Sequence, residues 1–297
     1  MPPAASPAKV TLFLMTEKGY TVLRHIIEQL DASLIDQVIG AQDPHLTHDY
    51  FEEIKNLCQA SGIPFASRTE PYSVTSTYAL AISWRWLIRE IDQLIVLHDS
   101  ILPRYRGFAP LVSALINGEN QLGVTALWAS GEYDRGPIIQ QAVRPVSYPL
   151  KIAQAISLAI ECYKELINSV MSAVASGSLP SGEPQQEEFA TYSLWRDEQD
   201  YRINWQADCH TIKRFIDALG PPYQGASAQA NGALIRVFDA EVEPDVRIEN
   251  RTAGKVLFLK DQLPVVVCGT GLLRLTQLRH ANNESALPLK QFRTRFT

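Results

Sequence analysis

The sequence has no long apolar run and little cysteine. No stretch reaches the ~18 consecutive apolar residues of a bilayer-spanning helix, and the opening MPPAASPAKV lacks the apolar core of a secretory signal. The four cysteines, Cys58, Cys162, Cys209 and Cys268, form no CxxC pair and share no zinc-finger spacing with histidine. These absences predict a cytoplasmic protein with reduced thiols, no metal site and no membrane contact.

A basic excess is also missing, because the formal net charge is −5. Residues 206–297 carry 12 Lys and Arg against 9 Asp and Glu, a net charge of +3, which leaves −8 for residues 1–205. A protein that grips nucleic acid through phosphates would show a basic excess, so such a partner is disfavoured. The length of 297 residues and the 46% apolar content predict a globular chain of about two domains.

The first half alternates short apolar runs with helical patterns, which predicts an α/β domain with a mostly parallel sheet. Strands are expected at 9–15, 34–40, 63–67, 79–83, 94–98 and 122–129, and helices at 20–30, 49–61, 109–118 and 150–174.

The second half begins after the segment SGSLPSGEPQQEE (176–188), which has the composition of a linker. We expect an α/β domain over residues 1–180, a linker over 181–205 and a β-rich domain over 206–297. Within the last, one helix is expected at 208–218. Short strands at 256–259, 265–267 and 272–275 predict a small, partly open β-barrel.

Polar residues follow several of the expected strands, where open α/β sheets bind ligands. His98 ends one strand and opens the loop HDSILPRYRG, and Asp134 lies in a second loop, EYDRG, expected at the same sheet edge. A carboxylate beside a histidine fixes its tautomer and stabilises its cation, which suits acid–base catalysis. Arg104 and Arg106 are candidate phosphate-binding residues, with plain surface arginines as the alternative. Lys18 lies in a turn before a helix that can hold an anion, with a plain tight turn as the alternative.

The stretch HDSILPRYRGFAPLVSALINGENQLGVT and the later GEYDRGPII resemble the signature of the 10-formyltetrahydrofolate-dependent formyltransferases. In that family an Asn-x-His-x-Ser-Leu-Leu-Pro-x-Tyr-x-Gly loop precedes Gly-Val-Thr and an Asp loop closed by Gly-Pro-Ile. His98, Ser100 and Asp134 match its histidine, serine and aspartate. More thinly, RINW, PPYQGA and GKVLFLKDQLPVVVCGTGLLRL resemble the C-terminal domain of methionyl-tRNA and sugar formyltransferases. The resemblance implies a Rossmann-like formyltransferase domain followed by an OB-like barrel.

The resemblance also implies an activity, an N-formyltransferase that uses 10-formyltetrahydrofolate to formylate a primary amine. His98 would act as the general base or as an oxyanion-stabilising cation, Asp134 would hold it, and Ser100 is the third catalytic candidate. The pterin would lie against main chain at Arg85, Trp86, Leu87, Ile88, Ser130, Gly131 and Glu132. The candidate substrate-binding residues are Lys18, Tyr20, Arg104, Tyr105 and Arg106.

One departure from the family pattern concerns the oxyanion. The family Asn lies two residues before the histidine, where this chain has Val96. Valine cannot donate a hydrogen bond, and one oxyanion donor contributes about 10²–10³ in rate. Three readings stay open: another donor replaces the amide, a different side chain enters by a change of register, or the protein binds folate without transferring formyl.

The acceptor amine is the remaining question. Glycinamide ribonucleotide transformylases are single-domain chains of about two-thirds this length, which argues against that acceptor. Methionyl-tRNA formyltransferases usually carry a basic loop after the second strand, whereas this chain has GAQDPHLTHDYFEE. A nucleotide-linked amino sugar is therefore the favoured acceptor, with tRNA second. The barrel is a candidate surface for a homodimer.

Overall fold

The computed structural model describes residues 8–88 and 91–297, so residues 1–7 of the opening segment lie outside the described residues. The chain forms two compact units. Unit 1 comprises residues 1–110, 121–145 and 156–194, and unit 2 comprises residues 111–120, 146–155 and 195–297. None of the helices in the described part is long and apolar enough to cross a membrane.

Unit 1 is built on a seven-stranded sheet of order β3-β2-β1-β4-β5-β7-β8. The first five of these strands run parallel, whereas β7 is antiparallel to both β5 and β8. This confirms the predicted mostly parallel sheet. The bounds are β1 Val10–Leu14, β2 Ile35–Gly40, β3 Phe65–Ser67, β4 Tyr78–Ile82, β5 Leu94–His98, β7 Gln121–Trp128 and β8 Ile138–Pro145.

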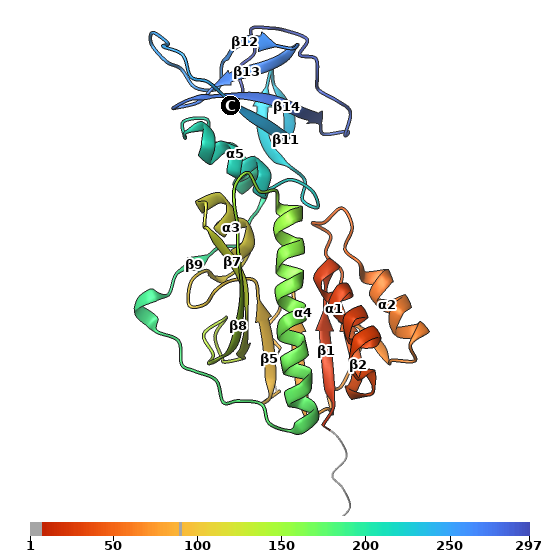
Figure 1. Cartoon of the computed structure of the whole chain (residues 1–297). Helices are drawn as coiled ribbons and strands as arrows, with labels where there is room; N and C mark the ends of the chain where they lie inside the picture. Colours follow the sequence, from red (N-terminus) through yellow and green to blue (C-terminus); the bar gives the residue numbers. More distant parts are fainter. Residues whose placement is uncertain (1–7, 89–90) are drawn as a thin grey trace, which may run out of the picture. The chain divides into compact units, whose positions relative to one another are not determined.

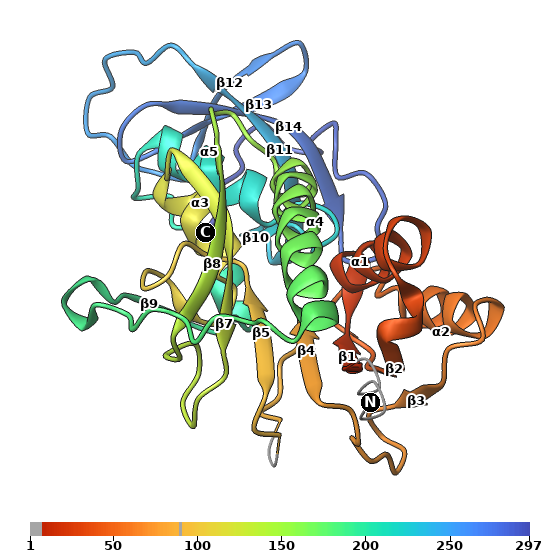
Figure 2. The ribbon, with the colours of Figure 1, turned by 60° about the horizontal axis from the view of Figure 1, so that its bottom comes forward.

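Helices cover one face of this sheet (Figures 1 and 2). They are α1 (Thr16–Gln29), α2 (Phe51–Ala60) and the unit 1 part of α4 (Ile152–Ser176). The helix α1 turns an apolar stripe inward through Val22, Leu23 and Ile26. It begins four residues earlier than its sequence pattern predicts.

The opposite sheet face carries a second apolar layer made largely by loops. Phe13, Ile39, Ala79, Ala81 and Leu94 are buried there. Side chains from irregular segments pack over them, including Trp84, Ile88 and Ile91. This loop-covered face leaves room for polar side chains near the end of β5.

Short elements complete unit 1. The strands β6 (Arg106–Gly107) and β9 (Tyr192–Ser193) pair in parallel, although they lie more than 80 residues apart in the sequence. Unit 1 also has the 3₁₀ turns η1 (Ala32–Leu34) and η2 (Glu187–Phe189), whereas the helix α3 (Pro110–Asn117) belongs to unit 2 from its second residue on.

Unit 2 contains a five-stranded antiparallel sheet of order β10-β11-β14-β13-β12. The C-terminal residues join its two edges. Thr297 exchanges two main-chain hydrogen bonds with Gln229 of β10, and Phe296 N–H donates to Gly254, just before β12. The sheet therefore closes into the predicted barrel. The elements are η3 Glu198–Tyr201, α5 Cys209–Ala218, β10 Ala226–Ala230, β11 Ala233–Glu243, β12 Val256–Lys260, β13 Leu263–Val267 and β14 Leu272–His280.

Candidate active site

His98 is the last residue of β5 and belongs to the loop-covered face. Side chains alternate along a strand, so Leu94, Val96 and His98 point the same way, and Leu94 lies in the buried cluster of that face. The imidazole is 8% exposed. A polar ring at this depth needs partners for both nitrogens.

The loop after β5 supplies the first partner. Ser100 Oγ donates to the carbonyl oxygen of Arg104 at 2.7 Å, and Thr125 Oγ1 donates to the Ser100 carbonyl at 2.7 Å. These bonds turn the loop back so that the Tyr105 carbonyl accepts from His98 Nε2 at 2.8 Å. Ser100 therefore shapes the loop. Because a carbonyl only accepts, Nε2 carries a hydrogen, and Nδ1 is the nitrogen that gains or loses a proton.

Asp134 is the second partner of His98. Its Oδ1 lies 3.4 Å from His98 Nδ1, and its Oδ2 accepts the Gly107 main-chain N–H at 2.8 Å. Gly107 has a φ of +95°, and a Cβ atom there would lie 2.6 Å from the Ser193 carbonyl oxygen. Only glycine therefore fits this position.

The predicted His98–Asp134 contact forms by a different route from the one expected. A parallel β7 would have delivered Asp134 to the edge of the sheet where β5 ends. The strand β7 is instead antiparallel, and its last residue, Trp128, lies beside Ile95 near the start of β5. Asp134 reaches His98 because the loop after β7 folds back.

Two residues that sequence reasoning missed hold this loop in place. Gln185 Nε2 donates to the carbonyl oxygens of Asp134 and Gly136, both at 2.8 Å, and its Oε1 accepts from Arg106. Glu187 accepts two further hydrogen bonds from Arg106. No motif marks either residue, because both lie in a segment whose composition resembles a linker.

Two predicted substrate-binding cations are engaged within the protein. Arg106 is fully buried, and its hydrogen bonds to Glu187 raise the pKa of the guanidinium above its usual value. It ties the segment around Gln185 to the loop and cannot meet a solvent-borne phosphate. The ammonium of Lys18 forms an ion pair with Asp99. Sequence reasoning placed both residues at a substrate, whereas in the structure each pairs with a carboxylate of the protein, Arg106 with Glu187 and Lys18 with Asp99.

Of the other predicted substrate-binding residues, Arg104 and Tyr20 lie nearer the surface, whereas Tyr105 is buried. Arg104 is exposed, with its guanidinium carbon 5.1 Å from the ring centre of Tyr105, which is buried. The Tyr20 ring packs at 5.6 Å from the Tyr50 ring. Arg104 is thus the one predicted phosphate-binding arginine that faces solvent.

The segment after β4 is the first of the two expected pterin-binding segments. Arg85 forms an ion pair with the fully buried carboxylate of Asp43, and Trp86 lies 3.8 Å beneath the Arg68 guanidinium. Leu87 is exposed, whereas Ile88 packs on the same cluster as Val96. This segment therefore borders the sheet face that carries His98.

The loop before Asp134 is the second expected pterin-binding segment. Ser130, Gly131 and Glu132 are exposed, and Ser130 Oγ donates to the Glu132 carbonyl at 2.9 Å. Exposed main chain thus lies close to the buried His98–Asp134 pair. That combination suits a heterocycle held by peptide groups.

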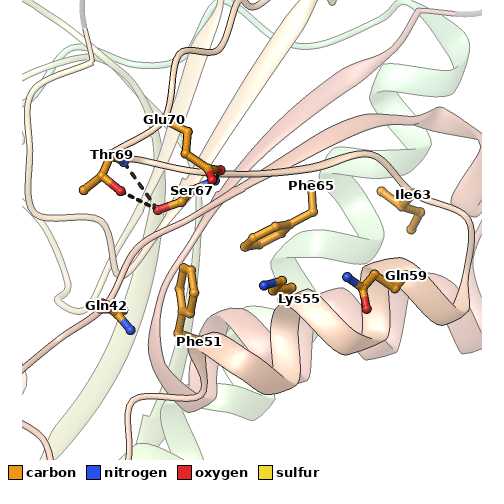
Figure 3. Close-up of a pocket in the computed structure, with 9 residues that line it drawn as sticks. All are labelled: Gln42, Phe51, Lys55, Gln59, Ile63, Phe65, Ser67, Thr69 and Glu70. Carbon is orange, nitrogen blue, oxygen red and sulfur yellow. Dashed lines mark hydrogen bonds between the residues drawn. The ribbon is translucent and has the colours of Figure 1, made fainter.

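A groove lies elsewhere in unit 1, between α2 and β3 (Figure 3). Its volume is about 450 Å³, and none of the predicted site residues lines it. The residues that line the groove are Gln42, Phe51, Lys55, Gln59, Ile63, Phe65, Ser67, Thr69 and Glu70.

Within residues 8–88 and 91–297, no group of three His, Cys, Asp or Glu side chains is arranged to hold a metal ion.

The fold is shared with a class of formyl-transferring enzymes. A crystal structure of WlaRD, a sugar 3N-formyltransferase, in the presence of dTDP and 5-N-formyl-tetrahydrofolate, superposes with a TM-score of 0.68. The two sequences are 16% identical, and the match covers 91% of this chain and 98% of WlaRD.

Sequence comparisons identify the family. The formyl transferase family matches residues 66–155, and the formyl transferase C-terminal domain matches residues 196–296, together more than half of the chain. The chain belongs to the formyltransferase family, and it is an N-formyltransferase.

Two methionyl-tRNA formyltransferases are similar in sequence. The Ralstonia nicotianae protein is 28% identical over 235 residues, which cover 78% of this chain and 71% of that protein. The Moorella thermoacetica protein is 31% identical over 200 residues, which cover 66% of this chain and 63% of that protein.

Proposed function

We propose that the chain transfers the formyl group of 10-formyltetrahydrofolate to the primary amine of a nucleotide-linked amino sugar, with His98 and Asp134 as the catalytic pair. The observation that carries the proposal is that the two nitrogens of the His98 imidazole have different partners. Nε2 is fixed on the Tyr105 carbonyl, whereas Nδ1 lies 3.4 Å from the Asp134 carboxylate. One nitrogen orients the ring and the other moves the proton.

In the proposed mechanism, each proton transfer takes place at a defined atom of His98. The donor supplies a formyl carbon that the neutral amine attacks. His98 Nδ1 accepts the proton that the amine loses, and Asp134 stabilises the imidazolium that results. The same Nδ1–H then donates to the departing nitrogen, which leaves a formamide and tetrahydrofolate. Peptide groups of residues 85–88 and 130–134 hold the pterin.

Val96 stands where the family has an Asn, so the hydrogen bond to the oxyanion must come from another donor. Val96 shares its sheet face with His98, and its neighbours across the strands are Ala81 and Leu127. None of these three side chains has a polar atom. Once it has accepted the amine's proton, His98 Nδ1–H is therefore the donor we assign to the oxyanion of the tetrahedral intermediate.

The surface after β2 supports a small acceptor over tRNA. Residues 41–50 contain no Lys or Arg. Their carboxylates are used inside the protein, because Asp43 pairs with Arg85 and Asp49 accepts the N–H groups of Asp43 and Phe51. Many unit 2 cations are also neutralised by carboxylates, namely Lys213, Arg236, Arg247, Arg251, Lys260 and Arg274.

Initiator methionyl-tRNA is the second candidate acceptor, since the two relatives described above are methionyl-tRNA formyltransferases. A folate-binding protein without transferase activity is the third, because of Val96. The test is a formylation assay with 10-formyltetrahydrofolate against UDP-, dTDP- and GDP-linked amino sugars and initiator Met-tRNA.

The assay separates the three functions. We expect turnover with an amino sugar and little dependence on salt. Turnover with Met-tRNA alone, falling steeply as salt rises, would show tRNA to be the acceptor. Tight folate binding without turnover of any amine would show a binding protein.

A further inference from the structure

A buried carboxylate directly follows the proposed catalytic histidine. Asp99 is the first residue after β5, and its side chain is 14% exposed. Its two oxygens have different partners on two helices: Oδ2 accepts from the ammonium of Lys18 in α1, and Oδ1 accepts from the Tyr163 hydroxyl in α4 at 2.6 Å. The strand end is thus tied to both helices.

Tyr163 contacts both neighbours of His98. Its hydroxyl lies 2.6 Å from Asp99 Oδ1 and 3.2 Å from the Leu97 carbonyl oxygen. The ring is fully buried, so it has little freedom to move. The main chain on either side of His98 is therefore fixed from the helix-covered face, whereas the imidazole is held on the opposite face by Tyr105 and Asp134.

The charges in this cluster are balanced. Burial opposes ionisation of Asp99, but the Lys18 ammonium, the Tyr163 hydroxyl and His98 together outweigh it and hold the pKa of Asp99 below its usual value. Burial, together with the Asp99 carboxylate, raises the pKa of Tyr163 well above its usual value. At neutral pH, Asp99 is a carboxylate and Tyr163 a protonated donor. The carboxylate therefore has a cation on one oxygen and a hydroxyl donor on the other.

We propose that Lys18, Asp99 and Tyr163 form a positioning network that sets the height and angle of His98 for proton transfer. This proposal rests on the proposed function, and it replaces the expectation that Lys18 binds the acceptor's phosphates. The three side chains act through the main chain of residues 97–99. They contact neither substrate.

The proposal predicts a loss confined to kcat. Tyr163→Phe removes one hydroxyl without changing shape, and a small misplacement of a catalytic group costs up to about 10²-fold. We expect kcat to fall between about 10- and 100-fold, with the KM for each substrate within about twofold of wild type. Tyr148→Phe is the matched control, since that hydroxyl also donates to a main-chain carbonyl, in unit 2.

Lys18 separates positioning from substrate binding. Lys18→Met should lower kcat, and Lys18→Arg, which keeps the charge and the donors, should recover part of the loss. An increase in acceptor KM at unchanged kcat in Lys18→Met would overturn the proposal and place Lys18 at the acceptor. Wild-type kcat in a folded Tyr163→Phe variant would also overturn it.

A readout without turnover keeps the proposal separate from the function on which it rests. The chain has 6 histidines, whose ring ¹⁵N signals can be followed by NMR. In Tyr163→Phe we expect the His98 signals to move and those of the other five rings to stay. Unmoved His98 signals would refute the positioning network. If the His98 signals move but no acceptor is formylated, only the proposed function fails.

Discussion

The His98 ring is anchored by a 2.8 Å hydrogen bond from its Nε2 atom to the Tyr105 carbonyl oxygen. In the proposed mechanism, proton transfer therefore falls to Nδ1, the atom that faces Asp134. We expect His98→Ala and Asp134→Asn each to lower kcat by on the order of 10²–10⁴-fold, the range for a lost acid–base group. Initial rates with the best acceptor measure this, with His25→Ala as the control. Near-wild-type rates in both variants would refute the assignment.

Restoring an amide at position 96 tests the missing oxyanion donor. Val96→Asn should leave kcat intact or raise it, because one added donor contributes up to about 10²–10³ in rate. Val96→Ala changes the volume of the side chain without adding a donor, and should not raise kcat. Abolished turnover in a folded Val96→Asn protein would show instead that the valine has a steric role.

The loop around Asp134 depends on Gln185. Gln185→Leu removes its bonds to Asp134, Gly136 and Arg106. We expect kcat to fall by about 10- to 100-fold, because Asp134 shifts relative to His98. The neighbouring Gln186 is exposed, and Gln186→Ala should behave as wild type. Equal activities of the two variants would contradict this account.

The proposed pterin-binding segment, residues 85–88, depends on the ion pair between Arg85 and Asp43. Arg85→Ala leaves the buried Asp43 carboxylate without its cation, so this segment should shift. We expect the KM for 10-formyltetrahydrofolate to rise several-fold and the KM for the acceptor to stay constant. Arg144→Ala, which breaks a more exposed ion pair with Glu165, is the control. A selective rise in acceptor KM would argue against this location of the pterin.

Acid should loosen the segment that Glu187 holds. Hydrogen bonds from Arg106 and Arg135 lower the pKa of Glu187 from 4.5 to about 2. A depressed pKa stabilises the fold above the unfolded-state value, and this stabilisation is lost as the pH falls from about 4.5 towards 2. The effect should be modest and weaken with salt, because Glu187 is exposed. Urea midpoints between pH 5 and 2 should fall less in Glu187→Gln than in wild type; equal slopes would contradict the prediction.

Much of the fold follows from local sequence patterns. The apolar runs of β1 and β5 and the amphipathic period of α4 predict those elements within a few residues. The strand β8 was missed because most of its residues are half-exposed and show no clear alternation. The direction of β7 was missed because strand pairing depends on long-range contacts.

The candidate site was only partly predictable, because several of its contacts also join residues that are far apart in the sequence. The spacing of motifs singled out His98 and Asp134, and the structure brings them together. Lys18 and Arg106 were assigned to substrate because a sequence shows a charge without showing its partner. Asp99 and Glu187 are those partners, and they lie 81 residues away in each case.

The pairing of β6 with β9 limits where the chain can be cut to give a fragment that still forms the site. Arg106 and Gly107, next to the proposed catalytic pair, are bonded to residues 185–193, which follow the long helix α4. During synthesis, the ribosome must therefore release about two-thirds of the chain before this site can assemble. An engineered catalytic fragment would need to extend at least to Ser193 to keep its aspartate loop in place.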